Sequence, residues 1–383
     1  MAFLGLAVAG CTPPPPKCNV ALTHGQSDID NHAPGTHFCL SGTHNWTLTP
    51  KSGDALVGPA VLDGGNSTQY AIISAANQRN VTLADLEVRN YTIRVDAQGA
   101  IRNADRSATG WVLNNINAHD NGSFDGSNWN GAGADLGVNW LVIGGRYHDN
   151  RQEGLAGGDL IQNTTVNGAE IDHNNFTNDA HTKQSSSCGH EAGGFKWVGN
   201  NITVEYSYIH DNACMGLWDD INSNGALITH NRVVNNWNSG IFHEVSLGAT
   251  ITYNTVIGNG FKTFDNNPPG CNPGWGAGIS DSDSGHTGSG NATVDVSHND
   301  VEGNCNGITG LDNGASGGSC GTECNVANFH VHDNKVVGSN NPLANNNTGN
   351  FEWDGPPNDV ANSNNTFANN TFSGGMNFCG NNC

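Results

Sequence analysis

Charged side chains are scarce in this sequence, and most of those present are acidic. Charged residues make up 13% of the 383 residues, about half of the ~25% that is usual for soluble domains. Lys and Arg number 14 against 35 Asp and Glu, which gives a formal net charge of −21. No basic cluster occurs, so nucleic acid and anionic lipid are poor partners on electrostatic grounds. An acidic substrate would need a bridging cation.

Long hydrophobic runs are also missing. The apolar start "MAFLGLAVAGC" is about half of the ~20 residues that a transmembrane helix needs. Small residues before Cys11 resemble the lipobox of bacterial lipoproteins, although the positively charged segment expected before it is missing. We interpret residues 1–18 as a signal- or lipoprotein-like leader with a Pro-rich linker, "TPPPPK", and expect an extracellular or cell-surface protein. The alternative to a lipid anchor at Cys11 is a plain signal remnant.

Cysteine, in contrast, is plentiful, with 11 residues. Reserving Cys11 for lipid leaves ten, which indicates disulfides and an oxidising compartment. The two C-x3-C units, "CGTEC" and "CGNNC", allow a zinc site instead, but no nearby histidine completes a familiar spacing. The expected disulfides join neighbours in sequence: Cys18 with Cys39, Cys188 with Cys214, Cys271 with Cys305, Cys320 with Cys324, and Cys379 with Cys383.

Glycine and asparagine dominate, and the asparagines recur in register with aliphatic residues. Gly accounts for 52 of 383 residues, roughly double the usual ~7%. A template of aliphatic, two residues, Asn, one residue, apolar is repeated with its Asn at 174, 231, 254, 299, 334 and 370, and variants centre on Leu86, Ile116 and Ser207. The shortest steps, 24 and 23 residues, are in the range of solenoid and propeller repeats.

The repeat predicts a parallel β-helix. Each unit contains short alternating runs divided by Gly and Asn turns, without a helical apolar period. Regular leucine-rich spacing and four-stranded propeller blades are both absent from the pattern. We therefore expect an all-β, single-stranded right-handed parallel β-helix of about ten turns with loop insertions, in which one Asn per turn forms a ladder. Residues 19–65 would form an N-terminal cap and first strands, and residues 66–383 the β-helix of a monomer.

Several segments resemble a known superfamily. The chain is similar to secreted right-handed β-helix proteins of the parallel-β-helix-repeat superfamily, which includes pectate-lyase-like and alginate-epimerase-like enzymes, and most closely to a largely uncharacterised bacterial branch. The resemblance covers most of residues 19–260 and implies the fold. It only suggests the chemistry, because the catalytic signatures of pectate lyases, polygalacturonases and alginate epimerases do not appear, and in particular a "DPHE" segment is missing. The segments that carry it are "GTHFCLSGTHNWTLTPKSGDALVGPAVLDGG" (35–65), "EAGGFKW" (191–197), "GLWDDIN" (216–222) and "GIFHEVS" (240–246).

Aligning the strands on their glycines predicts which residues share a face. The residue after Gly194, Gly216, Gly240 and Gly278 is Phe, Leu or Ile, which we assign inward. Alternation then points Lys196, Trp218 and Phe242 outward, Asp219 and His243 inward, and Asp220 and Glu244 outward.

Stacked outward residues predict a polysaccharide site. Strands ~4.8 Å apart would bring Asp220 and Glu244 into contact, so one must be protonated or a cation, here a calcium ion, must lie between them. Trp218 and Phe242 would bind sugar rings, unless they pack beneath a covering segment. Buried Asp219 and His243 would hydrogen-bond each other and support the site.

Two further residues complete the predicted site. Lys196 lies one turn before Asp220, and strand spacing predicts roughly 8 Å between Lys196 and that carboxylate. Glu191 would lie at the groove edge and bind substrate or calcium.

Three functions fit these residues. The first is a polysaccharide lyase on a uronic-acid polymer, with calcium on Asp220 and Glu244 and with Lys196 as the base for the C5 proton. The second is a glycoside hydrolase in which Asp220 and Glu244 are the catalytic pair. The third is a non-enzymatic glycan-binding surface scaffold. The sequence favours the lyase, because one sheet face cannot easily flank a scissile bond with two carboxylates.

Overall fold

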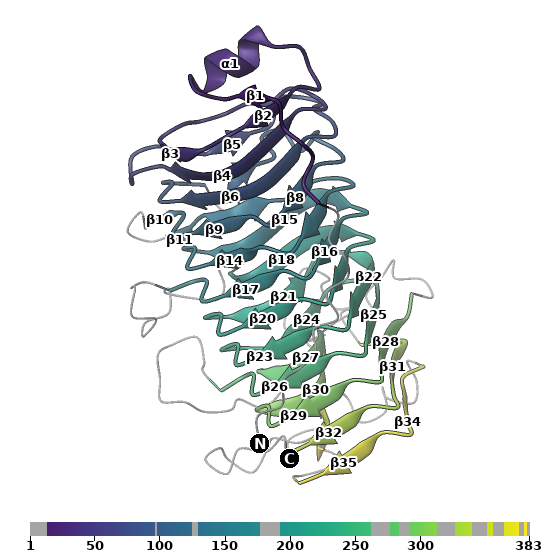
Figure 1. The fold of residues 1–383 in the computed structure, drawn as a ribbon. Helices are drawn as coiled ribbons and strands as arrows, with labels where there is room; N and C mark the ends of the chain where they lie inside the picture. Colours follow the sequence, from purple (N-terminus) through teal and green to yellow (C-terminus); the bar gives the residue numbers. More distant parts are fainter. Residues whose placement is uncertain are drawn as a thin grey trace.

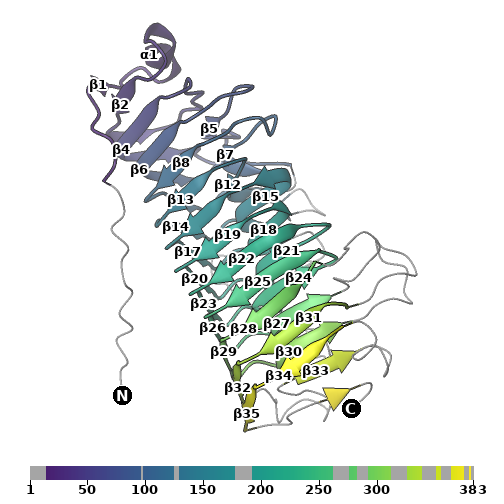
Figure 2. The same ribbon diagram turned by 90° about the vertical axis from the view of Figure 1, so that its right-hand side faces the viewer.

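The structure is a computed structural model that describes residues 14–95, 98–124, 129–176, 192–261, 276–282, 292–311, 326–338, 351–354, 364–374 and 379–380. The chain winds through short strands, and each strand pairs in parallel with the equivalent strand of the next turn (Figure 1). Figure 2 shows the resulting elongated stack, with the helix α1 (Gln26–Asn31) at one end. Ile29 of α1 is fully buried and caps the apolar core. No helix of the described ranges is long and apolar enough to cross a membrane.

Three stacks of strands form the walls of this β-helix, and we call them stacks A, B and C. Strands β4 (Ala55–Asp63) and β6 (Thr82–Arg89) bend between stacks B and C and belong to both. Strands β10 (Ser123–Phe124) and β11 (Trp129–Asn130) form a separate antiparallel pair.

Stack A consists of β5 (Ile72–Ile73), β7 (Gly99–Arg102), β12 (Ala132–Asp135), β15 (Glu153–Gln162), β18 (Gly193–Asn200), β21 (Met215–Asp219), β24 (Ile241–Glu244), β27 (Ala277–Ser282), β30 (Asn306–Leu311), β33 (Phe351–Asp354) and β36 (Cys379–Gly380). Besides β4 and β6, stack B consists of β1 (Val20–Ala21), β2 (His37–Cys39), β8 (Val112–Asn114), β13 (Leu141–Ile143), β16 (Thr165–Asn167), β19 (Thr203–Glu205), β22 (Asn224–Thr229), β25 (Gly248–Thr252), β28 (Val294–Ser297), β31 (Phe329–His332) and β34 (Thr366–Ala368). With β4 and β6, stack C consists of β3 (Gly42–His44), β9 (Asn117–His119), β14 (Arg146–His148), β17 (Glu170–Asp172), β20 (Tyr208–His210), β23 (Arg232–Val234), β26 (Thr255–Ile257), β29 (Asp300–Glu302), β32 (Lys335–Val337) and β35 (Thr371–Ser373).

The core is a continuous column of aliphatic side chains, about one from each strand of a turn. In stack A the inward residues Leu217, Ile241 and Ile279 lie directly above one another and are fully buried. Each buried aliphatic side chain contributes roughly 1.5–3 kcal/mol to stability. The predicted inward assignment after each glycine is confirmed for these strands.

Asparagines form two ladders rather than the single ladder that the sequence predicts. At each rung the side-chain Oδ1 accepts hydrogen bonds from the backbone N–H and the amide of the Asn one turn earlier, as Asn236 does for Asn212. The template with Asn174 therefore belongs to a different corner from the templates with Asn231 to Asn370. The ladder between stacks C and A contains Asn121, Asn150, Asn174, Asn212, Asn236, Asn259 and Asn304. The ladder between stacks B and C begins at Ser207 and contains Asn231, Asn254, Asn299, Asn334 and Asn370.

The first ladder explains a glycine near the start of six stack A strands, from β12 to β27. A Cβ atom on Gly216 would lie 2.8 Å from Nδ2 of Asn236 and 2.5 Å from the carbonyl oxygen of Gly240. The equivalent Cβ atoms on the other turns would meet the ladder amide at 2.8–3.2 Å, and the residues concerned are Gly133, Gly154, Gly194, Gly240 and Gly278. The ladder therefore leaves no space for a side chain at this position.

A column of exposed aromatic rings runs along the corner between stacks B and C. Tyr206, His230, Tyr253 and His298 stack with centroid distances of 5.0, 5.2 and 4.9 Å. All four have a positive φ of 51–56°, a conformation that bulky residues rarely adopt. The stacked rings stabilise the corner and offset part of this backbone cost.

Candidate functional site

The outward side of stack A brings most of the predicted site residues into one row. Strand register aligns Lys196 with Trp218, and Trp218 with Phe242, Ser280 and Thr309 on the following turns. These side chains point away from the apolar core, as the sequence predicts. They are nevertheless buried, with Lys196 5%, Trp218 7% and Phe242 1% exposed.

Lys196 and Asp220 form a direct ion pair. The Nζ atom of Lys196 lies 2.7 Å from Oδ2 of Asp220 and 3.7 Å from the centroid of the Trp218 ring. The predicted distance of roughly 8 Å between lysine and carboxylate is therefore wrong. The chain turns after β21, where Ile221 and Asn222 have positive φ, and the long lysine side chain spans the remaining gap.

Trp218 connects this ion pair to Glu244. The indole Nε1–H donates a hydrogen bond of 2.9 Å to Oε2 of Glu244. In the structure, Asp220 pairs with Lys196 and Glu244 accepts the hydrogen bond from Trp218, while the contact between the two carboxylates stays a prediction from the sequence. Oδ1 of Asp220 also accepts the backbone N–H of Ile221 at 2.8 Å.

The two outward aromatic residues belong to a small cluster apart from the main core. Trp218 and Phe242 lie 5.9 Å apart between ring centroids and pack with Cys214 and Met215. The sequence left open whether these rings contact a substrate or pack under a cover, and their burial is the property expected of a covered face. The predicted groove residue Glu191 lies outside the described residues.

Disulfides lie at three places in the described ranges. The predicted bond between Cys18 and Cys39 is confirmed, with an S–S distance of 2.11 Å. Cys214 and Cys305 are each disulfide-bonded as well. Their predicted partners, Cys188 and Cys271, lie outside the described residues, as do Cys11, Cys320, Cys324 and Cys383.

Behind the site, the core contains a buried ionisable group. Nδ1 of His243 lies 2.6 Å from Oδ2 of Asp219, and Nε2 lies 3.9 Å from Oδ1 of Asp281. All three side chains are at most 1% exposed. Burial acts to lower the pKa of His243, but the two carboxylates outweigh it and raise the pKa above its usual value. The predicted contact between Asp219 and His243 is confirmed.

Asp135 is a residue that sequence reasoning missed. It faces outward in the same row of stack A, aligned with Ala156, which in turn aligns with Lys196. Burial raises the pKa of Asp135 to about 8, although Arg106 and Arg102 act in the opposite direction. The segment "GAD" (133–135) was the signal in the sequence, because Asp135 lies two residues after the glycine, as the other outward residues of this row do.

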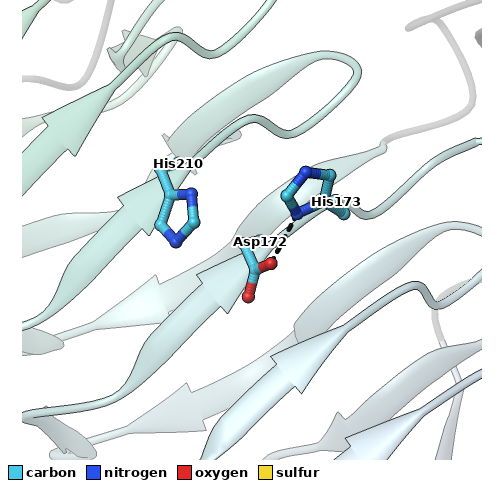
Figure 3. Close-up of side chains that lie close together, drawn as sticks. All are labelled: Asp172, His173 and His210. Atoms are coloured by element: carbon cyan, nitrogen blue, oxygen red, sulfur yellow. Dashed lines mark hydrogen bonds and ion pairs between the residues drawn. The ribbon is translucent and has the colours of Figure 1, made fainter. Parts of the chain in front are cut away.

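A second group that sequence reasoning missed lies where stack C turns toward stack A. Asp172 ends β17, His173 follows it, and His210 ends β20 on the next turn (Figure 3). One potential ligand atom from each residue lies within 4.8 Å of the other two, which makes this a candidate metal site. The signal in the sequence was the triplet "HDN" at 119–121, 148–150 and 210–212, which becomes "DHN" at 172–174.

Comparison with known proteins identifies the fold. No protein-family model and no curated protein matches the sequence. The periplasmic alginate epimerase AlgG has a similar structure, with a TM-score of 0.53, 11% identity, and 95% of this chain and 84% of that chain covered. The A-module of the Azotobacter vinelandii mannuronan C-5 epimerase AlgE6 aligns with a TM-score of 0.52, 13% identity, and 93% and 90% covered.

A third structure is more distant. The Dettilon tailspike protein has a TM-score of 0.49 and 12% identity over 86% of this chain, which spans 60% of the length of that protein. Identities this low establish a shared fold alone. The protein is thus a right-handed parallel β-helix, and the predicted fold class is confirmed.

Proposed function

We propose that this protein is an extracellular carbohydrate-active enzyme, a polysaccharide lyase that cleaves a uronic-acid-containing polymer. The observation that carries this proposal is the ion pair of Lys196 and Asp220 beside the Trp218 indole on the outward side of stack A. Because the two groups lie 2.7 Å apart, a proton could pass between them, and the pair would then supply both the base and the acid that an elimination needs. The disulfides at Cys39, Cys214 and Cys305 support export to an oxidising compartment.

In the proposed reaction Lys196 and Asp220 supply and accept all the protons, and the pair ends in the protonation state in which it began. The ammonium of Lys196 first gives a proton to Asp220, which leaves a neutral amine and a carboxylic acid. The amine then takes the C5 proton of the uronate, and the C–H electron pair forms the C4–C5 double bond as the bond between C4 and the glycosidic oxygen breaks. Asp220 protonates that oxygen. The pair returns to ammonium and carboxylate, as in the structure.

Both groups would reach the sugar from one side, because Lys196 lies on β18 and Asp220 directly follows the neighbouring strand β21. This arrangement suits a syn elimination, in which the proton and the leaving oxygen depart from the same face of the ring. Trp218 and Phe242 supply apolar ring faces, and Glu244 fixes the Trp218 indole. Lys196 is only 5% exposed, so the proposed reaction requires its amine to become accessible to the polymer.

Calcium on Asp220 and Glu244 does not fit this arrangement of side chains. Calcium takes 6–8 oxygen ligands, whereas Oδ2 of Asp220 is paired with the Lys196 ammonium, so a calcium ion bound there would lie beside another positive charge. In our proposal the Lys196 ammonium supplies the positive charge when the substrate binds, before it gives its proton to Asp220. No step depends on calcium, and we expect activity in the presence of a chelator.

Two alternatives have different support. A non-enzymatic surface scaffold is favoured by the burial of Trp218 and Phe242, which is expected of a face with a purely structural cover. A glycoside hydrolase that uses Asp220 and Glu244 has less support, because those carboxylates are engaged by Lys196 and Trp218.

The test uses the purified full chain with alginate, polygalacturonate and neutral glucans, each with calcium or with a chelator. Unsaturated-product absorbance and reducing ends are followed together, and a parallel reaction in D2O reports exchange at C5. The Lys196→Met variant is compared with Lys335→Met, which removes the lysine of another ion pair, with Asp300 on stack C.

The lyase proposal expects absorbance that persists with the chelator, is lost in Lys196→Met and is kept in Lys335→Met. Reducing ends without absorbance would indicate hydrolysis, and exchange at C5 without cleavage would indicate epimerisation. If no signal appears with any polymer, the scaffold alternative replaces the lyase.

A further inference from the structure

The corner between stacks C and A contains His–Asp pairs on four successive turns, and one turn reverses their order. On three turns the histidine ends the strand and the following aspartate accepts a hydrogen bond from its Nδ1, as in His119–Asp120, His148–Asp149 and His210–Asp211. On the remaining turn the strand ends with Asp172, and the corner residue is His173. The reversal places a fully buried carboxylate in register between His148 and His210.

Asp172 is held rigidly in this position. Arg146 donates Nε–H to Oδ1 at 2.8 Å and Nη2–H to Oδ2 at 2.6 Å, and Nδ1 of His173 lies 2.5 Å from Oδ2. Desolvation acts to raise the pKa of Asp172, but these partners together hold it well below its usual range. A carboxylate has about four lone-pair positions, so Arg146 can remain bound while the bond to His173 is exchanged for another ligand.

His173 and His210 lie among acidic side chains. Nε2 of His210 is 3.2 Å from Oε1 of Glu170, and the rings of His173 and His210 meet edge to face with centroids 5.9 Å apart. With both histidines neutral, as they would be when bound to a metal, the charges of Asp149, Asp172, Asp211 and Glu170 sum to −4, and Arg146 brings the total to −3. A divalent cation would reduce this to −1, so electrostatics favour its binding.

We propose that Asp172, His173 and His210 bind one divalent first-row transition metal ion. Two imidazoles and one carboxylate are a ligand set used for zinc and for iron, and they leave further coordination positions open. The ion replaces the proton shared by His173 and Asp172 and the contact of His210 with Glu170. Arg146 then acts as a positioning residue that fixes the carboxylate from behind. This site lies on stack C and does not depend on the proposed lyase activity.

The experiment titrates the full chain, without an affinity tag, with ZnCl2 by calorimetry and with CoCl2 by visible absorbance. We expect one ion per chain, a cobalt d–d spectrum and a rise in the thermal midpoint. His173→Ala and His210→Ala should each weaken binding by at least about tenfold. The matched controls are His119→Ala and His332→Ala, which remove histidines from "HDN" triplets outside the cluster and should retain full affinity.

Circular dichroism of each variant without metal shows whether it is folded. Asp172→Asn provides a further check of metal binding, because it keeps the shape of the side chain but removes the negative charge that the ion would contact. Equal affinity of the wild type and both ligand variants, or an equal loss in the control variants, would overturn the proposal. Polymer cleavage is measured separately, so failure of one proposal leaves the other intact.

Discussion

Nδ1 of His243 lies 2.6 Å from Oδ2 of Asp219 inside the apolar core, where neither side chain is exposed. Because Asp219 and Asp281 raise the pKa of His243 above 6.5, the folded state binds its proton more tightly than the unfolded chain. The resulting stabilisation is fully present below about pH 6.5 and is lost as the pH rises through the folded-state pKa.

We therefore expect the difference in thermal midpoint between wild type and His243→Gln to shrink from pH 6 to pH 9. His332→Gln is the control, because the His332 side chain is 32% exposed and solvent screens its carboxylate partners, so its loss should shift the midpoint less. A difference that stays constant or widens with pH would contradict the assigned direction of the pKa shift.

Asp135 should behave as a buried acid. Its pKa of about 8 means that the folded state holds a proton that the unfolded chain releases near 3.8. Stability is then lost as the pH rises from 3.8 through 8, so Asp135→Asn should be more stable than wild type at pH 8–9 and similar near pH 4. Thermal unfolding across this range measures the crossover, and a variant that is destabilised throughout would show that the carboxylate is ionised in the fold.

The buried ion pair of Lys196 and Asp220 predicts a strong coupling between the two positions. Lys196→Met or Asp220→Leu alone leaves a buried charge without its partner and should cost about 3–5 kcal/mol. The double variant removes both charges and should recover most of that stability. Denaturant unfolding gives the coupling energy, and additive effects would show that the pair does not interact in solution.

Activity separates the catalytic from the structural role of this pair. The double variant should be stable but inactive toward a polymer that the wild type cleaves. Cleavage by the double variant would remove Lys196 and Asp220 from the mechanism.

The glycine row should tolerate no side chain next to the asparagine ladder. Gly216→Ala places a Cβ atom 2.5 Å from a backbone oxygen and 2.8 Å from the Asn236 amide, so we expect a loss of several kcal/mol. Gly158→Ala is the matched control, because its Cβ would approach only the flexible guanidinium of Arg106. Similar thermal midpoints for the two variants would show that the ladder can shift to make room.

The column of exposed aromatic rings offers a test of two opposing effects on stability, ring stacking and the cost of positive φ. Tyr253→Asn removes two ring stacks, each contributing about 0.5–1.5 kcal/mol, but replaces a tyrosine at φ 56° with a residue that tolerates this conformation. We expect a net change in unfolding free energy of no more than about 1 kcal/mol. A loss well above 2 kcal/mol would mean that the stacking dominates the corner.

Periodicity in the sequence was sufficient for the fold and for the direction of most side chains. The aliphatic residue after each glycine predicted the inward row of Leu217 and Ile241, and alternation predicted the contact of Asp219 with His243. The sequence predicts one asparagine ladder instead of two, because both corners contain the same pattern: an aliphatic residue, two further residues, asparagine, one residue and an apolar residue. Only strand pairing distinguishes Asn174 from Asn231.

The candidate site was less predictable from the sequence, because strand spacing shows neither how far a side chain extends nor how deeply it is buried. Strand spacing fixes backbone distances but not how far a lysine side chain extends, so the contact of Lys196 with Asp220 was missed. Burial of Asp135 depends on neighbours from several turns. The reversed triplet at Asp172 and His173 was visible in the sequence, but its meaning needs the register with His210.

The number of residues between inward positions differs from one corner of the β-helix to another, and this shows where the chain accepts insertions. From β6 onward the inward residues of stacks B and C are five positions apart, as from Val204 to Ile209 and from Ile228 to Val233, whereas the irregular strand β4 has six from Leu56 to Leu62. From stack C to stack A the same step ranges from 7, between Val301 and Ile308, to 24, between Ile171 and Phe195. From β6 onward, insertions are thus confined to the borders of stack A, so the edges of that face can vary in length and sequence while the corner between stacks B and C keeps successive turns in register.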